Sequence, residues 1–324
     1  MPSLRRRLLA RPSARVASLF LLVLTLVAIL APFIANDRPV LAMVNGRWKS
    51  PALNPSFRVD RVAMDLAIYP PIRQSPNRVF LADRLQAPGR EHWLGTDELG
   101  RDLLARLIHG SRLSLVVGIT AALIALIAGV SLGALAGYFG GVVDWIISRL
   151  IEVVLCFPFL FLVLGIVALF EPSIWTIILA LGLTSWTTEA RLVRGEVLRA
   201  RNEAWAEAAR ASGAGGFRIL VSHLLPNAVS PALVSAGFGV ASAILVESAL
   251  SFLGFGVQVP NASWGSVLSS ASEYIRQAWW IALFPGLAIF ATVISCHIVA
   301  ERLRDVLDPT MIERLETEEL LVNR

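Results

Sequence analysis

The chain has 324 residues, of which 56% are hydrophobic and only 16% are charged, and its mean hydropathy is +0.66. Soluble globular domains carry about 25% charged residues, so this composition excludes a chain of two or three soluble domains and indicates a polytopic membrane protein. The formal net charge is +5, but no basic patch interleaves with aromatic residues, so we expect the lipid bilayer and no nucleic acid as a partner.

The scarcity of lysine and cysteine excludes several kinds of site. Lys49 is the only lysine, and it lacks the glycines of the phosphate-binding loop G-x-x-x-x-G-K-[ST], so this chain does not bind ATP by that route. Cys156 and Cys296 both lie in apolar stretches, and we interpret them as small buried hydrophobic residues. We therefore expect no metal site and no cofactor in this chain.

We predict six transmembrane helices, because six apolar runs approach the ~20 residues that cross a bilayer. The runs are 16–34, 113–143, 145–170, 172–188, 224–246 and 278–300. The second run exceeds one span, so its helix should end near the glycine-rich turn at 137–141, and Pro158 should kink the third helix. The first run is longer than the apolar region of a signal peptide, so we expect an uncleaved anchor.

Arginines concentrate before the first run, between the fourth and fifth, and after the sixth. The positive-inside rule therefore places both termini in the cytoplasm. The arginines of the long loop after the first span are discounted, because long loops translocate largely regardless of charge. The predicted parts are a cytoplasmic N-terminus and first transmembrane helix (1–35), an external loop (36–111), a core five-helix domain (112–305) and a cytoplasmic tail (306–324).

The external loop contains two local patterns. An apolar run at 40–44 followed by Asn45-Gly46 predicts a small hairpin or an irregular cap. Residues 97–108 place leucines on one helical face and charges opposite, which predicts an amphipathic helix capped by Thr96 or Asp97. We expect this helix to lie at the membrane surface and to lead into the second span.

The charged cytoplasmic segment at 189–223 should contain a short helix. Asn202 can cap a helix over 203–211, Gly213 can end it, and a second helical stretch over 217–225 leads to Pro226. A short alanine-rich helix held parallel to the membrane suits insertion into a groove on another protein. An ordinary solvated helical loop is the alternative.

This segment resembles the EAA motif, E-A-A-x₃-G-x₉-I-x-L-P, of the permease subunits of type I ABC importers. The matching residues are Glu207, Ala208, Ala209 and Gly213, followed at a shifted interval by Ile219 and Leu225-Pro226. In that family the loop is the coupling helix, which docks into the ATPase subunit. The resemblance implies that Glu207 seats the helix in the ATPase cleft. It also implies that Ala208 and Ala209 allow close backbone approach and that Gly213 reverses the chain.

Three further stretches resemble the oligopeptide/dipeptide/nickel permease family. They are 95–102 (Gly-Thr-Asp-Glu-Leu-Gly-Arg-Asp), 247–258 with the following Ser263-Trp264-Gly265, and 303–309. Together they extend the resemblance from about residue 95 to residue 309. The chain looks like the second of two paralogous permeases, the kind that contains GTD-x-x-GRD.

The resemblance implies an all-α polytopic membrane protein with the six-helix type I ABC importer permease fold, in the bacterial cytoplasmic (inner) membrane. The implied function is import of di- or oligopeptides by alternating access, without enzymatic activity in this chain. The implied partners are a paralogous permease in a heterodimer, two ABC ATPase subunits that bind ATP and Mg, and an external solute-binding protein. Nickel or another small solute is the alternative within the family.

Two functions of other classes are disfavoured by the sequence. An ion-gradient-driven secondary transporter is expected to show repeated halves with midplane charges, and an intramembrane enzyme to show paired catalytic groups at one depth. Glu152 and Glu247 lie near predicted span ends and are interpreted either as substrate-pathway charges or as structural pairs. The tryptophans near span ends are interpreted as an aromatic belt: Trp145, Trp175, Trp186, Trp264, Trp279 and Trp280.

Overall fold

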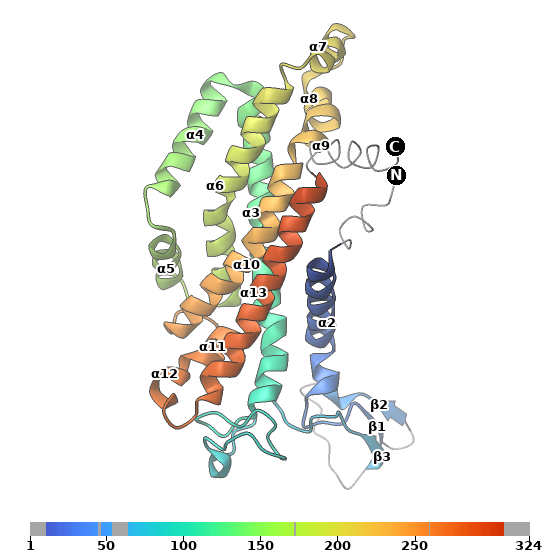
Figure 1. Ribbon diagram of the computed structural model, residues 1–324, viewed down its shortest axis with the longest axis vertical. Helices are drawn as coiled ribbons and strands as arrows, with labels where there is room; N and C mark the ends of the chain where they lie inside the picture. The colour runs from blue at the N-terminus through green and yellow to red at the C-terminus, as the bar shows by residue number, and fades with distance from the viewer. Residues whose placement is uncertain (1–10, 45–46, 54–63, 172, 259, 308–324) are drawn as a thin grey trace, which may run out of the picture.

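The computed structural model describes residues 11–44, 47–53, 64–171, 173–258 and 260–307. Its long helices run along the length of the molecule, with a small sheet at one end and the short helix α7 (Ala204–Ala211) at the other (Figure 1). We call these the sheet end and the α7 end. The long elements are α2 (Pro12–Ile34), α3 (Leu103–Phe139), α4 (Gly141–Leu155), α5 (Phe159–Leu169), α6 (Ile174–Ala200), α10 (Ser230–Phe252) and α13 (Trp280–Leu307).

Four of the described helices are long and apolar enough to cross a membrane alone: α2, α3, α10 and α13. Helices α4 and α5 meet the same requirement only together, as a span broken by a bend of 88°. The expected all-α polytopic fold is confirmed, and up to five of the six predicted spans are present. The fourth predicted span, 172–188, lies in α6, which packs along α3 and α10, but polar residues such as Thr184 and Glu189 lower its hydropathy.

Helix α6 approaches α3 closely because glycines of α3 face it. A Cβ atom at Gly133 would sit 2.4 Å from the carbonyl oxygen of Ala190, and one at Gly137 would sit 2.8 Å from that of Arg194. Real Cβ atoms essentially never come within 3.0 Å of such atoms, so glycine is what permits this approach. The contact fixes the direction in which α6 leaves the bundle.

The predicted amphipathic helix over 97–108 is wrong in its first half. Residues 97–102 form a turn, in which the Asp97 Oδ1 accepts hydrogen bonds from the backbone N–H groups of Leu99 and Arg101, both at 2.9 Å. Helix α3 begins only at Leu103, and its cap is Asp102, whose Oδ1 accepts from the Ala105 N–H at 2.7 Å. The positive φ of Gly100 (69°) and the local bonding of Asp97 compete with the helix. Residues 103–108 are simply the first turns of α3.

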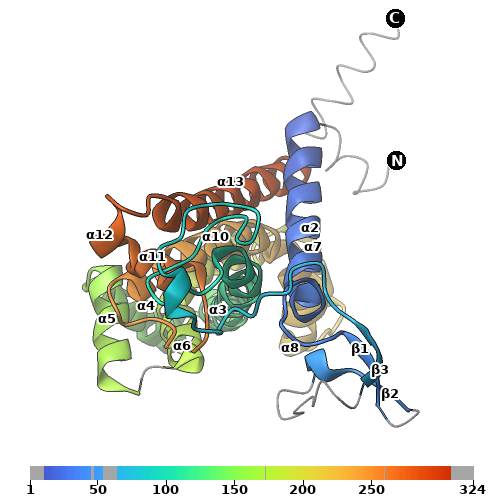
Figure 2. The ribbon, with the colours of Figure 1, turned by 90° about the horizontal axis from the view of Figure 1, so that it is seen from below.

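The hairpin predicted after residue 40 is confirmed. Strands β1 (Leu41–Val44) and β2 (Arg47–Lys49) pair antiparallel on either side of Asn45-Gly46, which lies outside the described residues. A third strand, β3 (Met64–Ile68), pairs with the other edge of β1, so the sheet order is β2-β1-β3. Figure 2 shows this sheet beside the lower end of α2, away from the bundle.

The kink predicted at Pro158 is present as a full break. Helix α4 ends at Leu155 and α5 starts directly after Pro158, because proline cannot supply the backbone N–H that a continuous helix requires. The Cys156 side chain in this break is exposed, contrary to its expected burial, whereas Cys296 is buried.

The predicted aromatic belt is half wrong. Trp145, Trp175 and Trp279 are exposed, as a belt requires, but Trp186, Trp264 and Trp280 are buried. The indole of Trp264 donates to the carbonyl oxygen of Leu107 at 3.1 Å, so it joins α11 (Trp264–Ser269) to α3. The next short helix, α12 (Ala271–Tyr274), leads from α11 to α13. Trp264 and Trp280 belong to one buried cluster at the sheet end, whereas Trp186 packs in a separate cluster with Ile147 and Ile151 of α4.

Candidate functional site

Helix α6 carries the chain out of the bundle toward the segment that resembles a coupling loop. It continues to Ala200, well past the predicted end at residue 188. Its last turns contain charged residues, and Arg199 pairs with Glu196, one turn earlier on the same face, at 3.0 Å. Residues 189–200 of the predicted segment therefore belong to α6, and the chain leaves the helix only before α7.

The N-terminus of α7 differs in detail from the prediction. Asn202 does not cap it, because the Asn202 side chain instead donates to the carbonyl oxygen of Leu198 at 3.2 Å. The residue at the cap position is Glu203, which makes no side-chain cap bond. Glu207 lies in the first turn, where a carboxylate is favoured by the helix dipole.

The two faces of α7 have different environments. Ala206 is fully buried, and Ala209 packs on a cluster that includes Ile219 and Leu224. Glu207 and Ala208 are exposed, and the Glu207 carboxylate has no hydrogen bond or ion pair with any residue in the described ranges. The helix is therefore held by one face and presents the other, so Ala208 lies on the presented face and Ala209 does not.

Gly213 ends α7 as predicted. Its φ is +81°, in the left-handed region that glycine adopts without strain, and the following Ala214 N–H donates to the Ala209 carbonyl oxygen at 3.2 Å. The chain then reverses into α8 (Gly216–Ile219), a π-helical turn over Leu220–Leu224 and α9 (Leu225–Ala228).

The return stretch anchors the segment to the bundle. The Ile219 side chain is buried, Leu225 is half-buried, and Pro226 is exposed in the first turn of α9, where its missing N–H costs little. Nine residues separate Gly213 from the motif's isoleucine position, which holds His223, so Leu225-Pro226 are in register and only the isoleucine is displaced.

Two arginines fasten this segment to the neighbouring helices. The Arg201 guanidinium donates to the carbonyl oxygens of Gly137 and Tyr138, at 3.1 and 3.3 Å, and so caps the C-terminal end of α3. Arg194 of α6 binds Asp144 of α4 through two bonds, at 2.5 and 2.8 Å. These bonds join α6 and its C-terminal cap residue to α3 and α4.

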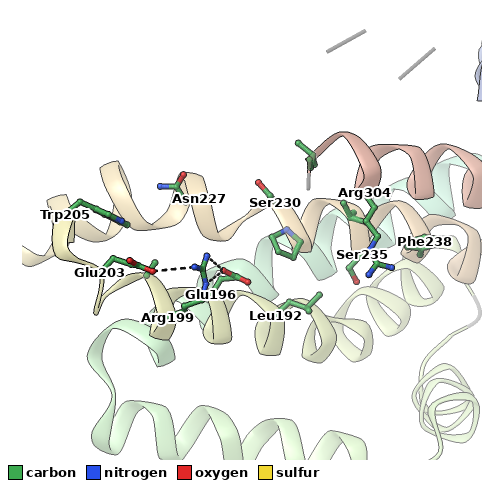
Figure 3. Close-up of a pocket in the computed structure, with 14 residues that line it drawn as sticks. Leu192, Glu196, Arg199, Glu203, Trp205, Asn227, Ser230, Ser235, Phe238 and Arg304 are labelled. Atoms are coloured by element: carbon green, nitrogen blue, oxygen red, sulfur yellow. Dashed lines mark hydrogen bonds and ion pairs between the residues drawn. The ribbon is translucent and has the colours of Figure 1, made fainter. Parts of the chain in front are cut away.

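A cavity of about 880 Å³ lies beside this segment, between α6, α7, α10 and α13 (Figure 3). Trp205 of α7 and Phe238 of α10 contribute aromatic surface to its lining. Its charged and polar lining residues are Glu196, Arg199, Glu203, Asn227, Ser230, Ser235 and Arg304. Sequence reasoning did not identify this cavity, because its walls come from parts of the chain more than a hundred residues apart.

The two carboxylates singled out in the sequence have unlike surroundings. Glu152 is exposed and pairs with Arg149, three residues away on the same helix. Glu247 is fully buried; its Oε1 accepts from Ser251 at 2.7 Å and its Oε2 from Ser114 at 3.4 Å. No ion pair to Glu247 exists within the part of the chain that the structure describes.

A third carboxylate, Glu189, was missed because the predicted helix stopped before it. It is buried, its Oε1 accepts from Ser235 at 3.2 Å, and its Oε2 has no partner among the described atoms. Ser235 also lines the cavity, so Glu189 lies directly behind the cavity wall.

The sheet end carries a buried ionic cluster built around the stretch 95–102. Asp97 binds Arg101 at 2.7 Å and Arg106 at 3.3 Å, and His92 contacts Asp102 at 2.8 Å. The Asp97–Arg101 and His92–Asp102 contacts fix the turn that starts α3, whereas the buried Nε atom of Arg106 makes no hydrogen bond to the described atoms. Within the described residues, no group of histidines, cysteines and carboxylates has the arrangement of a metal site.

The comparisons with known proteins agree on one class. The family model described as a binding-protein-dependent transport system inner membrane component matches residues 129–313. The dipeptide transport system permease protein DppC of Alkalihalophilus pseudofirmus is 41% identical over 248 residues, which cover 76% of this chain and 82% of that protein. A putative peptide transport system permease protein of Brucella suis is 36% identical over 306 residues, covering 94% and 90%.

The fold also resembles a solved structure. A chain from the inward-facing MetNI methionine ABC transporter superposes with a TM-score of 0.50 at 18% sequence identity. The match covers 62% of this chain and 96% of that one. At this identity the likeness establishes the fold alone.

Proposed function

The chain belongs to the family of binding-protein-dependent transport system inner membrane components, and from that premise we propose that it is the permease subunit of an ATP-driven peptide importer. Members of this family are multi-pass membrane subunits, and ATP hydrolysis belongs to separate subunits. The family membership also implies ATPase and substrate-binding partners. An ion-gradient-driven transporter and an intramembrane enzyme are thereby excluded.

The proposed topology has six spans and both termini in the cytoplasm. Helix α6 is the proposed span that its own hydropathy does not indicate, and α3 and α10 pack along its more polar sequence. Helix α2 starts and α13 ends toward the α7 end, where Arg11 approaches Asp305 at 3.8 Å (Figure 1). With both termini proposed in the cytoplasm, the α7 end is the proposed cytoplasmic side. The parts remain those of the sequence: 1–35, the external 36–111, the core 112–305 and the tail 306–324.

The proposed partners are a paralogous permease in a heterodimer, two ABC ATPase subunits that bind ATP and Mg, and an external solute-binding protein. The observation that carries this proposal is the geometry of α7. Its outer face, with Glu207 and Ala208, is free to enter an ATPase groove, while Arg201 and Arg194 join the preceding helix α6 to α3 and α4. Glu207, Ala208 and Gly213 are the proposed docking and turn residues; Ala209, Ile219, Leu225 and Pro226 are the proposed mount.

Import follows from rigid transmission. When the ATPase subunits close on ATP, α7 moves with the groove that holds it, and α6 moves with α7. The bonds of Arg201 to α3 and of Arg194 to α4 move those two helices as well. Alternating access requires two packings of the bundle, and the proposed movement switches between them, which opens the path to one side of the membrane and closes it to the other. No bond in the solute changes in this chain. Glu152, exposed and paired, and Glu247, buried among serines, are proposed as structural groups.

Di- and oligopeptides are the proposed solutes, because several relatives are named as dipeptide or peptide permeases. Nickel or another small solute is the alternative within the wider family. Uptake of labelled di- and tripeptides by the complete transporter in proteoliposomes tests this, with the binding protein added outside. Transport of nickel without any peptide transport would overturn the assignment.

Docking through α7 is tested with Glu207→Lys, which reverses the charge on the exposed face without touching the mount. We expect loss of ATPase-subunit binding and of peptide-stimulated ATP hydrolysis, while membrane insertion persists. The matched control is Glu273→Lys, an exposed glutamate of α12 at the opposite end. Wild-type ATPase binding by Glu207→Lys would contradict docking through this face.

A further inference from the structure

The cavity beside α7 has walls of opposite charge. On the α6 side, one arginine serves two carboxylates, since Arg199 binds Glu196 at 3.0 Å and Glu203 at 3.5 Å. This wall therefore carries a net negative charge. On the α13 side, Arg304 makes no ion pair with any residue of the described chain (Figure 3). A ligand with a positive and a negative end can satisfy both walls at once.

The remainder of the lining suits a peptide. Trp205 and Phe238 offer apolar contact for side chains, and Asn227 and Ser230 offer hydrogen-bonding groups for amide units. The volume of about 880 Å³ lies within the roughly 300–1,000 Å³ of small-molecule sites. An anionic lipid headgroup fits less well, because Glu196 and Glu203 would repel it.

We propose that this cavity binds a short zwitterionic peptide at the cytoplasmic end of the transport path, with the peptide carboxylate at Arg304 and the ammonium group at Glu196 and Glu203. The proposal rests on the proposed function and adds the place and chemistry of substrate contact. Glu203 is the N-cap residue of α7 and Trp205 lies in its first turn, so α7 itself forms part of one wall of the cavity. Movement of α7 on the ATPase therefore alters the site and releases the peptide.

Protection of a cysteine tests this in the complete ATP-free transporter in nanodiscs. Ser230→Cys places a thiol in the cavity wall, in a chain whose exposed Cys156 is replaced by serine. We expect millimolar trialanine to slow maleimide labelling of Cys at 230 several-fold, read on this chain by mass spectrometry. The matched control is Ser222→Cys, on the exposed return stretch, whose labelling should not change.

Two further arms test the charges. Arg304→Gln should weaken protection by trialanine about tenfold, the cost of one charge-assisted hydrogen bond, whereas Arg218→Gln, exposed on α8, should leave it unchanged. Trialanine with an acetylated N-terminus and amidated C-terminus should not protect.

Three results would overturn the proposal. The first is no protection by trialanine in a complex that imports trialanine, and the second is equal protection by the uncharged derivative. The third is labelling that is already slow without peptide in phosphatidylglycerol nanodiscs, but not in nanodiscs of uncharged lipid. The first leaves the importer function standing, and the third assigns the cavity to lipid. A complex that imports no peptide removes the premise as well, and the uptake assay detects that separately.

Discussion

The contact between α3 and α6 gives a quantitative prediction. Gly133→Ala would place a Cβ atom 2.4 Å from the Ala190 carbonyl oxygen, whereas ordinary contact begins at 3.4 Å, so the two backbones must move apart at this point. The obstructing atoms belong to the backbone, so no side-chain rotation relieves the overlap. Such overpacking costs about 1–3 kcal/mol.

Alanine also favours helix over glycine by about 1 kcal/mol, so a matched control is needed to isolate the packing cost. Gly195→Ala provides it, since Gly195 lies in α6 with nothing within 4 Å of its ideal Cβ position. Both variants gain the same helix propensity, so the difference between their free energies of unfolding is the overpacking cost, about 1–3 kcal/mol.

The assay is thermal or denaturant unfolding of the purified chain in one detergent, with wild type, Gly133→Ala and Gly195→Ala side by side. We expect Gly195→Ala to equal or exceed wild type in stability and Gly133→Ala to fall below both. Separation of the helices also pulls Arg201 from the end of α3, so coupling of ATP hydrolysis to uptake should weaken. Equal stability of the two alanine variants would refute the argument for backbone contact between α3 and α6.

The remaining predictions concern single hydrogen bonds. Arg201→Met removes the bonds to the end of α3 and should lower peptide-stimulated ATP hydrolysis while ATPase-subunit binding persists, whereas Arg218→Met should change neither; loss of binding itself would show that Arg201 does not act through its bonds to α3. Trp264→Phe deletes a buried indole bond and should cost about 1–3 kcal/mol of unfolding free energy, against less than about 0.5 kcal/mol for the exposed Trp145→Phe; equal costs would contradict the core role of Trp264.

The sequence predicted well those features that adjacent residues determine. Hydropathy runs located the long helices. Gly213 marked the end of α7, because the turn there needs a positive φ, which glycine adopts without strain. Local rules failed where two of them competed. Leucine spacing favoured a helix from residue 97, but Gly100 and the side-chain bonds of Asp97 stopped it until Asp102.

Features that depend on distant parts of the chain could not be predicted. Trp186, Trp264 and Trp280 lie near span ends in the sequence, yet each is buried by helices far away along the chain. Helix α6 was cut short at Glu189 because a charge is costly in lipid, while in the structure Ser235 of α10 accommodates that carboxylate. The cavity could not be predicted for the same reason, since Glu196 and Arg304 line one cavity only in the folded chain.

The residues that resemble the EAA motif divide into two physical roles. Glu207 and Ala208 face outward, where substitution should alter contact with a partner without destabilising the fold. Ala209 and Ile219 face inward, so their substitution should loosen α7 from its mount and reduce coupling even if docking survives. These buried residues hold α7 against the bundle, which the proposed transmission of force requires.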